Sequence, residues 1–172
     1  MTIPTQPDNA TGHAGPASAE PKTDPRRQAR ICALQFLHQL DVQAGENLEQ
    51  LDGFVNEQLA DMAAGELAKQ WIRGTWQNHP QIDRQISQVC RNWDLARINL
   101  VDLSNLRLAL YQLEFCKDIP ERVVINEAIE LARLFSTTAA PGFVNGILDA
   151  VRAAKSGQEA EFAVHPPGND GQ

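Results

Sequence analysis

The sequence predicts an all-α fold, and three observations support that prediction. Apolar residues recur every three or four positions through most of the chain, which is the spacing of one face of a helix. The alternation of apolar and polar residues that is typical of a half-buried strand is absent. The β-branched run Val123-Val124-Ile125 is short and continues into a helix-periodic stretch.

Seven helical segments are expected. Asp24-Pro25 pairs an N-cap with a proline at the first helical position, and Pro120 and Pro141 open two later segments. Gly45 and His79-Pro80 are interpreted as helix ends. The apolar stripes of the seven segments run from Ile31 to Leu40, Leu48 to Leu59, Leu67 to Trp76, Ile82 to Trp93, Leu103 to Leu113, Val124 to Phe135 and Val144 to Val151.

Two polar segments frame one predicted domain. Seven of the ten prolines lie in residues 1–25 or 156–172, which are also poor in large apolar side chains. Such segments bury too little apolar surface to offset the entropy of ordering them, so both are predicted to be disordered tails. The intervening residues 26–155 are numerous enough to form a single domain with its own core.

The charge of the chain is concentrated in these tails. The formal net charge is −7, of which residues 1–25 contribute −2 and residues 156–172 contribute −3. The domain is therefore close to neutral, and the acidic total does not exclude an anionic partner.

No apolar run approaches the roughly 20 residues of a membrane helix, and the N-terminus lacks the pattern of a secretory signal. A cytoplasmic protein is expected.

Nothing in the sequence predicts an enzyme. The H-E-x-x-H and G-x-S-x-G patterns and glycine-rich phosphate loops are absent. Cys32, Cys90 and Cys116 are too scattered for a zinc site and have no evident base partner, so they are interpreted as small buried apolar residues. No metal or cofactor is predicted.

Arg26, Arg27 and Arg30 form a basic cluster in the first turn and a half of the first helix. Cations there face the positive end of the helix dipole, which costs about 0.3–1 kcal/mol each. One interpretation is an anion site, where arginine side chains and backbone N–H groups bind a phosphate. The other is a solvated cluster paired with Asp24 or other acids. The spacing alone does not choose between them.

The last helical segment contains a second anomaly. Asn145-Gly146 is normally a turn signal, yet the apolar stripe runs straight through it. Glycine inside a helix costs about 1 kcal/mol relative to alanine, so a close approach to a packed helix or to a ligand is expected here. Phe143, in the first turn after Pro141-Gly142, is expected to remain partly exposed, where it could stack on a base.

These stretches resemble the NusB family of transcription antitermination factors over residues 26–155. The resemblance rests on five segments in the family's order. They are Arg26-Arg27-Gln28-Ala29-Arg30-Ile31-Cys32-Ala33-Leu34-Gln35, Trp93-Asp94-Leu95-Ala96-Arg97-Ile98 through Val101-Asp102, Leu106-Arg107-Leu108-Ala109-Leu110-Tyr111, Val124-Ile125-Asn126-Glu127-Ala128-Ile129-Glu130-Leu131-Ala132 and Phe143-Val144-Asn145-Gly146-Ile147-Leu148-Asp149.

The resemblance implies a NusB-like fold of about seven helices in two small orthogonal bundles, and a non-enzymatic role. Family members pair with the small-subunit ribosomal protein NusE. The pair binds the single-stranded boxA element of nascent rRNA and helps RNA polymerase to pass terminators. Carried over by position, the implied RNA contacts are Arg26, Arg27, Arg30, His38, Phe143 and Asn145.

Asp102, with Val101 beside it, falls where the family presents an acidic contact to NusE. Asn126 and Glu127 are interpreted as mainly structural. Gln28 replaces a common basic residue of the family, and the loop of residues 136–142 lacks the charged side chains often found there. Since fewer cations mean fewer phosphate contacts, weak RNA binding is expected alone and tighter binding with NusE.

Two functions are compatible with the sequence. The first is an RNA-binding antitermination factor that works as a heterodimer with NusE. The alternative is a NusE-binding scaffold with little RNA affinity of its own. The sequence does not decide whether the free protein is a monomer or a homodimer. It also suggests that the acidic residues 1–24 compete with RNA for the arginine cluster.

Overall fold

The computed structural model describes residues 24–90 and 94–157. This part of the chain consists of helices and contains no strand, which confirms the predicted all-α class. Short 3₁₀ turns at Leu48–Gln50 and Leu95–Arg97 precede the second and fourth helices. The six α-helices are α1 (Pro25–Val42), α2 (Leu51–Gln58), α3 (Met62–Val89), α4 (Leu100–Phe115), α5 (Glu121–Phe135) and α6 (Ala140–Lys155).

Some sequence-based predictions fall outside the described residues. They concern Trp93 and nearly all of the two predicted tails. Among the described helices, none has both the length and the apolar character needed to cross a membrane.

The helix starts follow the signals in the sequence. The carboxylate of Asp24 accepts a hydrogen bond from the backbone N–H of Arg26 at 3.0 Å, and Pro25 is the first residue of α1. Pro120 is the N-cap of α5, and Pro141 lies in the first turn of α6. The run Val123-Val124-Ile125 belongs to α5, so its helical interpretation is confirmed.

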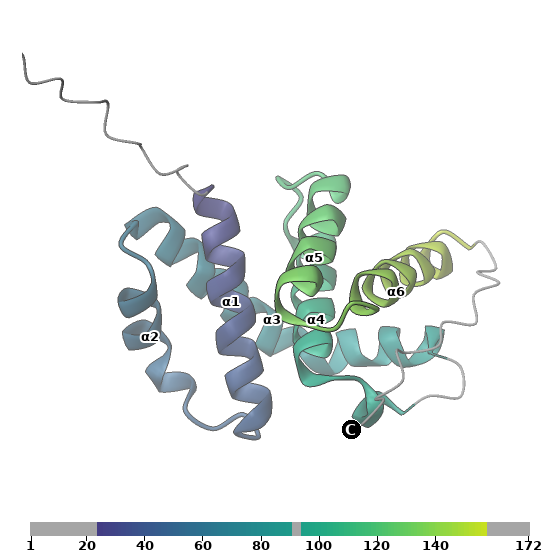
Figure 1. Cartoon of the computed structure of the whole chain (residues 1–172), viewed down its shortest axis with the longest axis horizontal. Helices are drawn as coiled ribbons and strands as arrows, with labels where there is room; N and C mark the ends of the chain where they lie inside the picture. The colour runs from purple at the N-terminus through teal and green to yellow at the C-terminus, as the bar shows by residue number, and fades with distance from the viewer. Residues whose placement is uncertain (1–23, 91–93, 158–172) are drawn as a thin grey trace, which may run out of the picture.

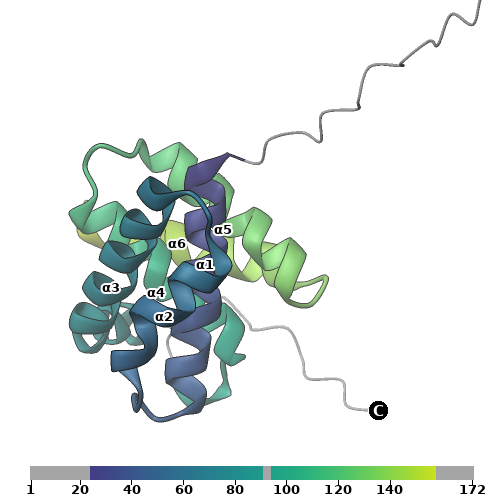
Figure 2. The same cartoon turned by 90° about the vertical axis from the view of Figure 1, so that its left-hand side faces the viewer.

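The helices form two bundles that share one core. Helices α1, α2 and α3 pack on one another, as do α4, α5 and α6, while α1 and α3 also pack on α4. Figure 1 shows α1 and α2 on the left and α4, α5 and α6 further to the right, with α3 running from the left side into the right. Figure 2, seen from the side of the first bundle, places α1, α2 and α3 in front.

Residues 24–90 and 94–157 contain six α-helices, close to the expected number of about seven, and one predicted helix break is wrong. Residues 67–76 and 82–93 were expected to form two helices broken at His79-Pro80, but α3 continues from Met62 to Val89 through Pro80. Proline has no N–H to donate to the carbonyl of Trp76 four residues earlier. The Nδ1 of the His79 ring donates a hydrogen bond to that carbonyl instead. The rings of His79 and Trp76 also stack, with their centroids 4.5 Å apart. Helix α3 therefore continues through Pro80 without a break.

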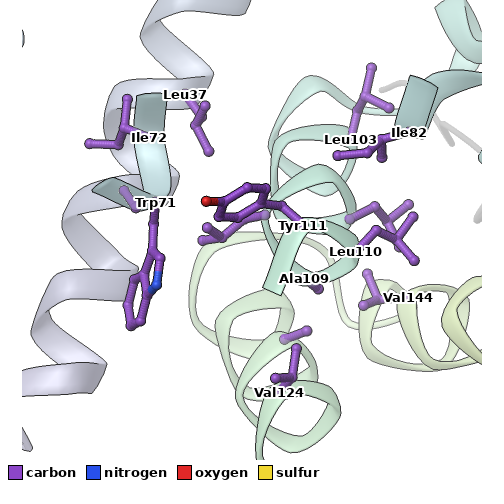
Figure 3. Packing of buried hydrophobic residues seen from close by; sticks show 14 of the residues in the cluster. Leu37, Trp71, Ile72, Ile82, Leu103, Ala109, Leu110, Tyr111, Val124 and Val144 are labelled. Carbon is purple, nitrogen blue, oxygen red and sulfur yellow. The ribbon is translucent and has the colours of Figure 1, made fainter. Parts of the chain in front are cut away.

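Helices α3 and α4 approach each other closely at Gly74. A β-carbon at Gly74 would lie 2.1 Å from the hydroxyl oxygen of Tyr111, so only glycine fits the present packing. Figure 3 shows the Tyr111 hydroxyl pointing toward the stretch of α3 that carries Trp71 and Ile72. Side chains from both bundles are buried around this contact, which fixes α4 relative to α1 and α3.

Candidate functional site

The arginine cluster lies where the start of α1 faces α5 and the loop before it. Arg26 pairs with Asp118 of that loop, with the closest nitrogen and oxygen atoms 3.5 Å apart. Arg27 reaches Glu127 at 3.8 Å and Glu130 at 3.7 Å, both on α5. The side chains of Arg26 and Arg27 are 51% and 32% exposed. Both guanidinium groups are therefore accessible from solvent and already face carboxylates.

Arg30, which the family resemblance implies as an RNA contact, is buried and so differs from its two neighbours. Its side chain is 3% exposed, and its Nε donates a hydrogen bond to the Oε1 of Gln112 at 3.2 Å. The guanidinium lies 5.1 Å from the ring centroid of Trp71 and 3.9 Å from Glu127. Burial lowers the pKa of Arg30, and Glu127 opposes that effect. Arg30 therefore ties α1 to α3, α4 and α5 from inside.

These contacts decide how the cluster is arranged in the unbound chain. The sequence left open an anion site or pairing with acids, and the structure shows the pairing. Glu127, interpreted as structural, contacts both Arg27 and the buried Arg30. Glu130 lies three residues later on the same face of α5. Of the three arginines in the cluster, it contacts Arg27 alone.

His38 lies on α1 two turns beyond Arg30. It is half-buried, and its Nδ1 has no hydrogen-bond partner among the described residues. This Nδ1 atom is itself buried, so the described structure neither uses it in a hydrogen bond nor presents it to solvent.

Phe143 and Asn145 lie away from the arginine cluster. Arg26 pairs with the loop before α5, and Arg27 pairs with the middle of α5. Helix α6 instead starts next to the C-terminal end of α5 (Figure 1). No hydrogen bond or ion pair within residues 24–90 and 94–157 joins the two groups. The Nδ2 of Asn145 donates instead to the carboxylate of Asp149 at 3.3 Å.

The expected exposure of Phe143 is corrected. Its exposed fraction is 6%, and it belongs to the hydrophobic core. The first turn of α6 turns this side chain inward because α6 packs on α5, α4 and α3. The ring is therefore unavailable for stacking on a base in this conformation.

Asp102, which the family resemblance implies as a contact for NusE, is buried. Asp102 is 2% exposed in the first turn of α4, and one carboxylate oxygen lacks a hydrogen-bond partner among the described residues. Burial raises the pKa of Asp102, and the neighbouring hydroxyl of Ser136 acts in the opposite direction. Val101 is half-buried. Asp102 therefore faces the α5–α6 connection rather than solvent.

Exposed apolar side chains precede both Asp102 and Ser136 in the sequence. Leu100 is 39% exposed just before Val101, and Leu134 and Phe135 are 59% and 38% exposed just before Ser136. We call Leu100, Val101, Leu134 and Phe135 the α4–α5 apolar patch. Large apolar side chains left in solvent together are typical of a surface that binds another protein.

One largely buried polar cluster, centred on Arg107, was not predicted from the sequence. The Nε and Nη2 of Arg107 each donate to the carboxylate of Asp83 at 2.7 Å, and its Nη1 donates to Asp41. The hydroxyl of Ser104 donates to the same Asp41 at 2.7 Å. The only local signal was an arginine within the apolar run of α4, because its two acidic partners lie far away in the sequence. The described residues contain no group of three or more His, Cys, Asp or Glu that could hold a metal ion.

Comparison with known protein families gives a consistent picture. The model of the NusB family matches residues 27–153. The transcription antitermination protein NusB of Geobacter sulfurreducens is 43% identical over 127 residues, which are 73% of this chain and 92% of that protein. NusB of Syntrophus aciditrophicus is 39% identical over 142 residues, which are 83% of this chain and 88% of that protein.

Solved structures share the fold. T. maritima NusB superposes with a TM-score of 0.67 at 40% identity, covering 75% of this chain and 91% of that one. A chain from a structure of antitermination factors NusB and NusE in complex with dsRNA gives a TM-score of 0.69 at 28% identity, covering 76% and 97%.

Proposed function

The chain belongs to the NusB family of transcription antitermination factors, and we propose that it binds boxA-type RNA of nascent rRNA together with NusE. In this role it acts without catalysis or a cofactor, as part of an RNA polymerase antitermination complex in the cytoplasm. A related NusB chain forms a complex with NusE and dsRNA, which supports both partner classes.

The observation that carries the proposal is the pair of accessible guanidinium groups at the start of α1. Arg26 and Arg27 are adjacent, and both reach solvent at the same helix end. A guanidinium donates paired hydrogen bonds to phosphate oxygens, and the first turn of a helix favours anions. We assign these two residues as direct phosphate contacts. Arg30 supports this helix end from inside. Phe143 belongs to the core at the start of α6, while His38 and Asn145 remain candidate contacts.

The α4–α5 apolar patch is the surface that we assign to NusE. It includes Val101, and its members are sequence neighbours of the buried Asp102 or of Ser136, which contacts Asp102, so it retains the location that the family resemblance implies for this contact. Because the carboxylate of Asp102 is covered, its role is to shape the start of α4 rather than to touch the partner.

A NusE-binding scaffold with little RNA affinity is the second candidate function. The observation that favours it is the neutralisation of Arg26 and Arg27 by Asp118, Glu127 and Glu130 in the unbound chain. Under this alternative the apolar patch carries the function, and the arginine cluster serves only the fold.

RNA binding distinguishes the two functions. Fluorescence anisotropy with a labelled boxA-type RNA is measured with and without NusE over a series of salt concentrations. Each single-strand phosphate contact contributes at most about −0.7 to the slope of log affinity against log salt, so Arg26→Ala/Arg27→Ala should flatten the slope by up to about 1.4. The matched control is Arg73→Ala/Arg152→Ala, which removes two exposed, ion-paired arginines elsewhere. If both double variants bind like the parent, the RNA surface is misassigned.

Pairing with NusE is tested on the apolar patch in a pull-down. Leu134→Lys places a charge on the patch and should strongly reduce the NusE retained. Val42→Lys is the control, since Val42 of α1 is 62% exposed, close to the 59% of Leu134, and lies outside the patch. Equal retention of NusE by both variants would contradict the assigned surface.

A further inference from the structure

The carboxylates that face Arg26 and Arg27 occupy places where an RNA phosphate would have to lie. Helix α1 packs on α3 and α4 rather than on α5, so the contact between α1 and α5 consists mainly of long charged side chains. Separating such a pair uncovers little apolar surface. An exposed ion pair is also weak, because both charges keep most of their hydration.

The three carboxylates differ in how easily they can be displaced. Asp118 is 69% exposed and contacts Arg26 alone among the three arginines of the cluster. Glu130 is 39% exposed and has a second partner, Arg133, one turn further along α5. Glu127 is 20% exposed and contacts the buried Arg30. Moving Glu127 would leave a buried guanidinium without its nearby carboxylate, whereas Asp118 and Glu130 can move away at little cost.

We propose that Asp118 and Glu130 are internal competitors of the RNA backbone, which occupy Arg26 and Arg27 until two phosphates displace them together. The inference rests on the proposed function. It assigns a specificity role to these acids, because a small anion replaces only one carboxylate, whereas a phosphodiester chain replaces both. Glu127 acts differently, as a positioning residue that holds Arg30 and so fixes the start of α1.

A double-mutant cycle tests the competition. In the presence of NusE, Glu130→Gln should tighten binding of the labelled boxA-type RNA about 2- to 5-fold, which is the range of an exposed ion pair. In the Arg27→Ala background, Glu130→Gln should have no effect, because the arginine for which it competes is absent. Asp118→Asn should behave in the same way toward Arg26→Ala.

A matched control separates competition from a general change in charge. Glu66 of α3 also forms an ion pair one turn along its own helix, with Lys69, and within the described residues it forms no ion pair with any of the three arginines of the cluster. Glu66→Gln removes the same charge and should leave RNA affinity unchanged within a factor of about 1.5. The salt slope of Glu130→Gln should become steeper, since an unoccupied arginine releases more counterions when RNA binds.

The outcomes separate this inference from the proposed function. If the parent protein with NusE does not bind the RNA, the proposed function itself fails. If the parent binds and Arg27→Ala weakens binding, but Glu130→Gln binds like the parent, only the competition is overturned. The competition is also overturned if Glu130→Gln still raises RNA affinity in the Arg27→Ala background, or if Glu66→Gln raises RNA affinity by the same factor.

Discussion

Arg30 and Arg107 are buried arginines whose charges the fold compensates to different degrees. Arg107 has two carboxylates in hydrogen-bond contact, and although burial acts to lower its pKa, Asp83 and Asp41 raise it overall. Arg30 has one amide partner and one carboxylate at 3.9 Å, and burial lowers its pKa. A buried cation with incomplete compensation depends on every neighbour it has.

Arg30→Ala is expected to destabilise the protein by about 1–3 kcal/mol, because it leaves the buried Gln112 side chain without its partner. Urea unfolding followed by circular dichroism gives the free energy of unfolding. Arg73→Ala, which removes an exposed arginine, should stay within about 0.5 kcal/mol of the parent. An Arg30→Ala variant of unchanged stability that has lost RNA binding would restore Arg30 as a direct contact.

Asp102 allows a test of pH dependence. Its pKa is raised from the ordinary value of 3.8, so the folded state binds the proton more tightly than the unfolded state. The contribution of Asp102 to the free energy of unfolding therefore falls as the pH rises from about 4 through the folded-state pKa. Asp102→Asn removes this loss, and its stability relative to the parent should increase between pH 4 and pH 7. A difference that is constant over this range would show that Asp102 ionises as freely as in the unfolded chain.

At the scale of the helix, Pro80 and His79 are coupled inside α3. The His79 ring supplies the donor that Pro80 cannot, so His79→Ala should cost about 0.5–1.5 kcal/mol of stability. In the Pro80→Ala background an N–H becomes available for the Trp76 carbonyl, and His79→Ala should cost clearly less. Unfolding of the four variants in urea measures this coupling. Equal costs in both backgrounds would show that the ring does not replace the missing donor.

Sequence patterns predicted helices well where the signals are local. N-caps and prolines placed the starts of α1, α5 and α6, and the apolar stripes identified the core faces. Pro80 was read as a helix end because the side-chain bond that rescues the carbonyl has no sequence signature. The exposure of a residue at a helix start is also not local information. Arg30, Asp102 and Phe143 are buried by helices that are distant in the sequence.

The chemistry of the candidate site was predicted only in part for the same reason. The arginine cluster was visible as a violation of the helix-dipole preference, and both of its interpretations could be stated. Choosing between them required knowing that Glu127 and Glu130, a hundred residues later, face the start of α1. Helix periodicity places the two acids on one face of α5 but does not indicate what that face meets.

At the scale of the whole molecule, the two bundles are joined through buried polar and apolar contacts. Arg107 of α4 links Asp41 of α1 with Asp83 of α3, while Tyr111 packs against Gly74. Opening one bundle alone would expose this cluster and part of the shared core. We therefore expect the described domain to unfold as one cooperative unit.

The three cysteines of the chain report on this cooperativity. Cys32 lies in α1, Cys90 follows α3 and Cys116 follows α4, and all three are free and buried. Burial raises the pKa of Cys32 to about 11 and also raises the pKa of the other two, so at pH 8 none is a reactive thiolate. In native protein, modification by a thiol reagent should be slow and should proceed at one common rate set by unfolding. Arg107→Ala should accelerate all three equally, as measured by mass spectrometry of the labelled peptides. Early labelling of a single cysteine would reveal that one bundle opens while the other stays folded.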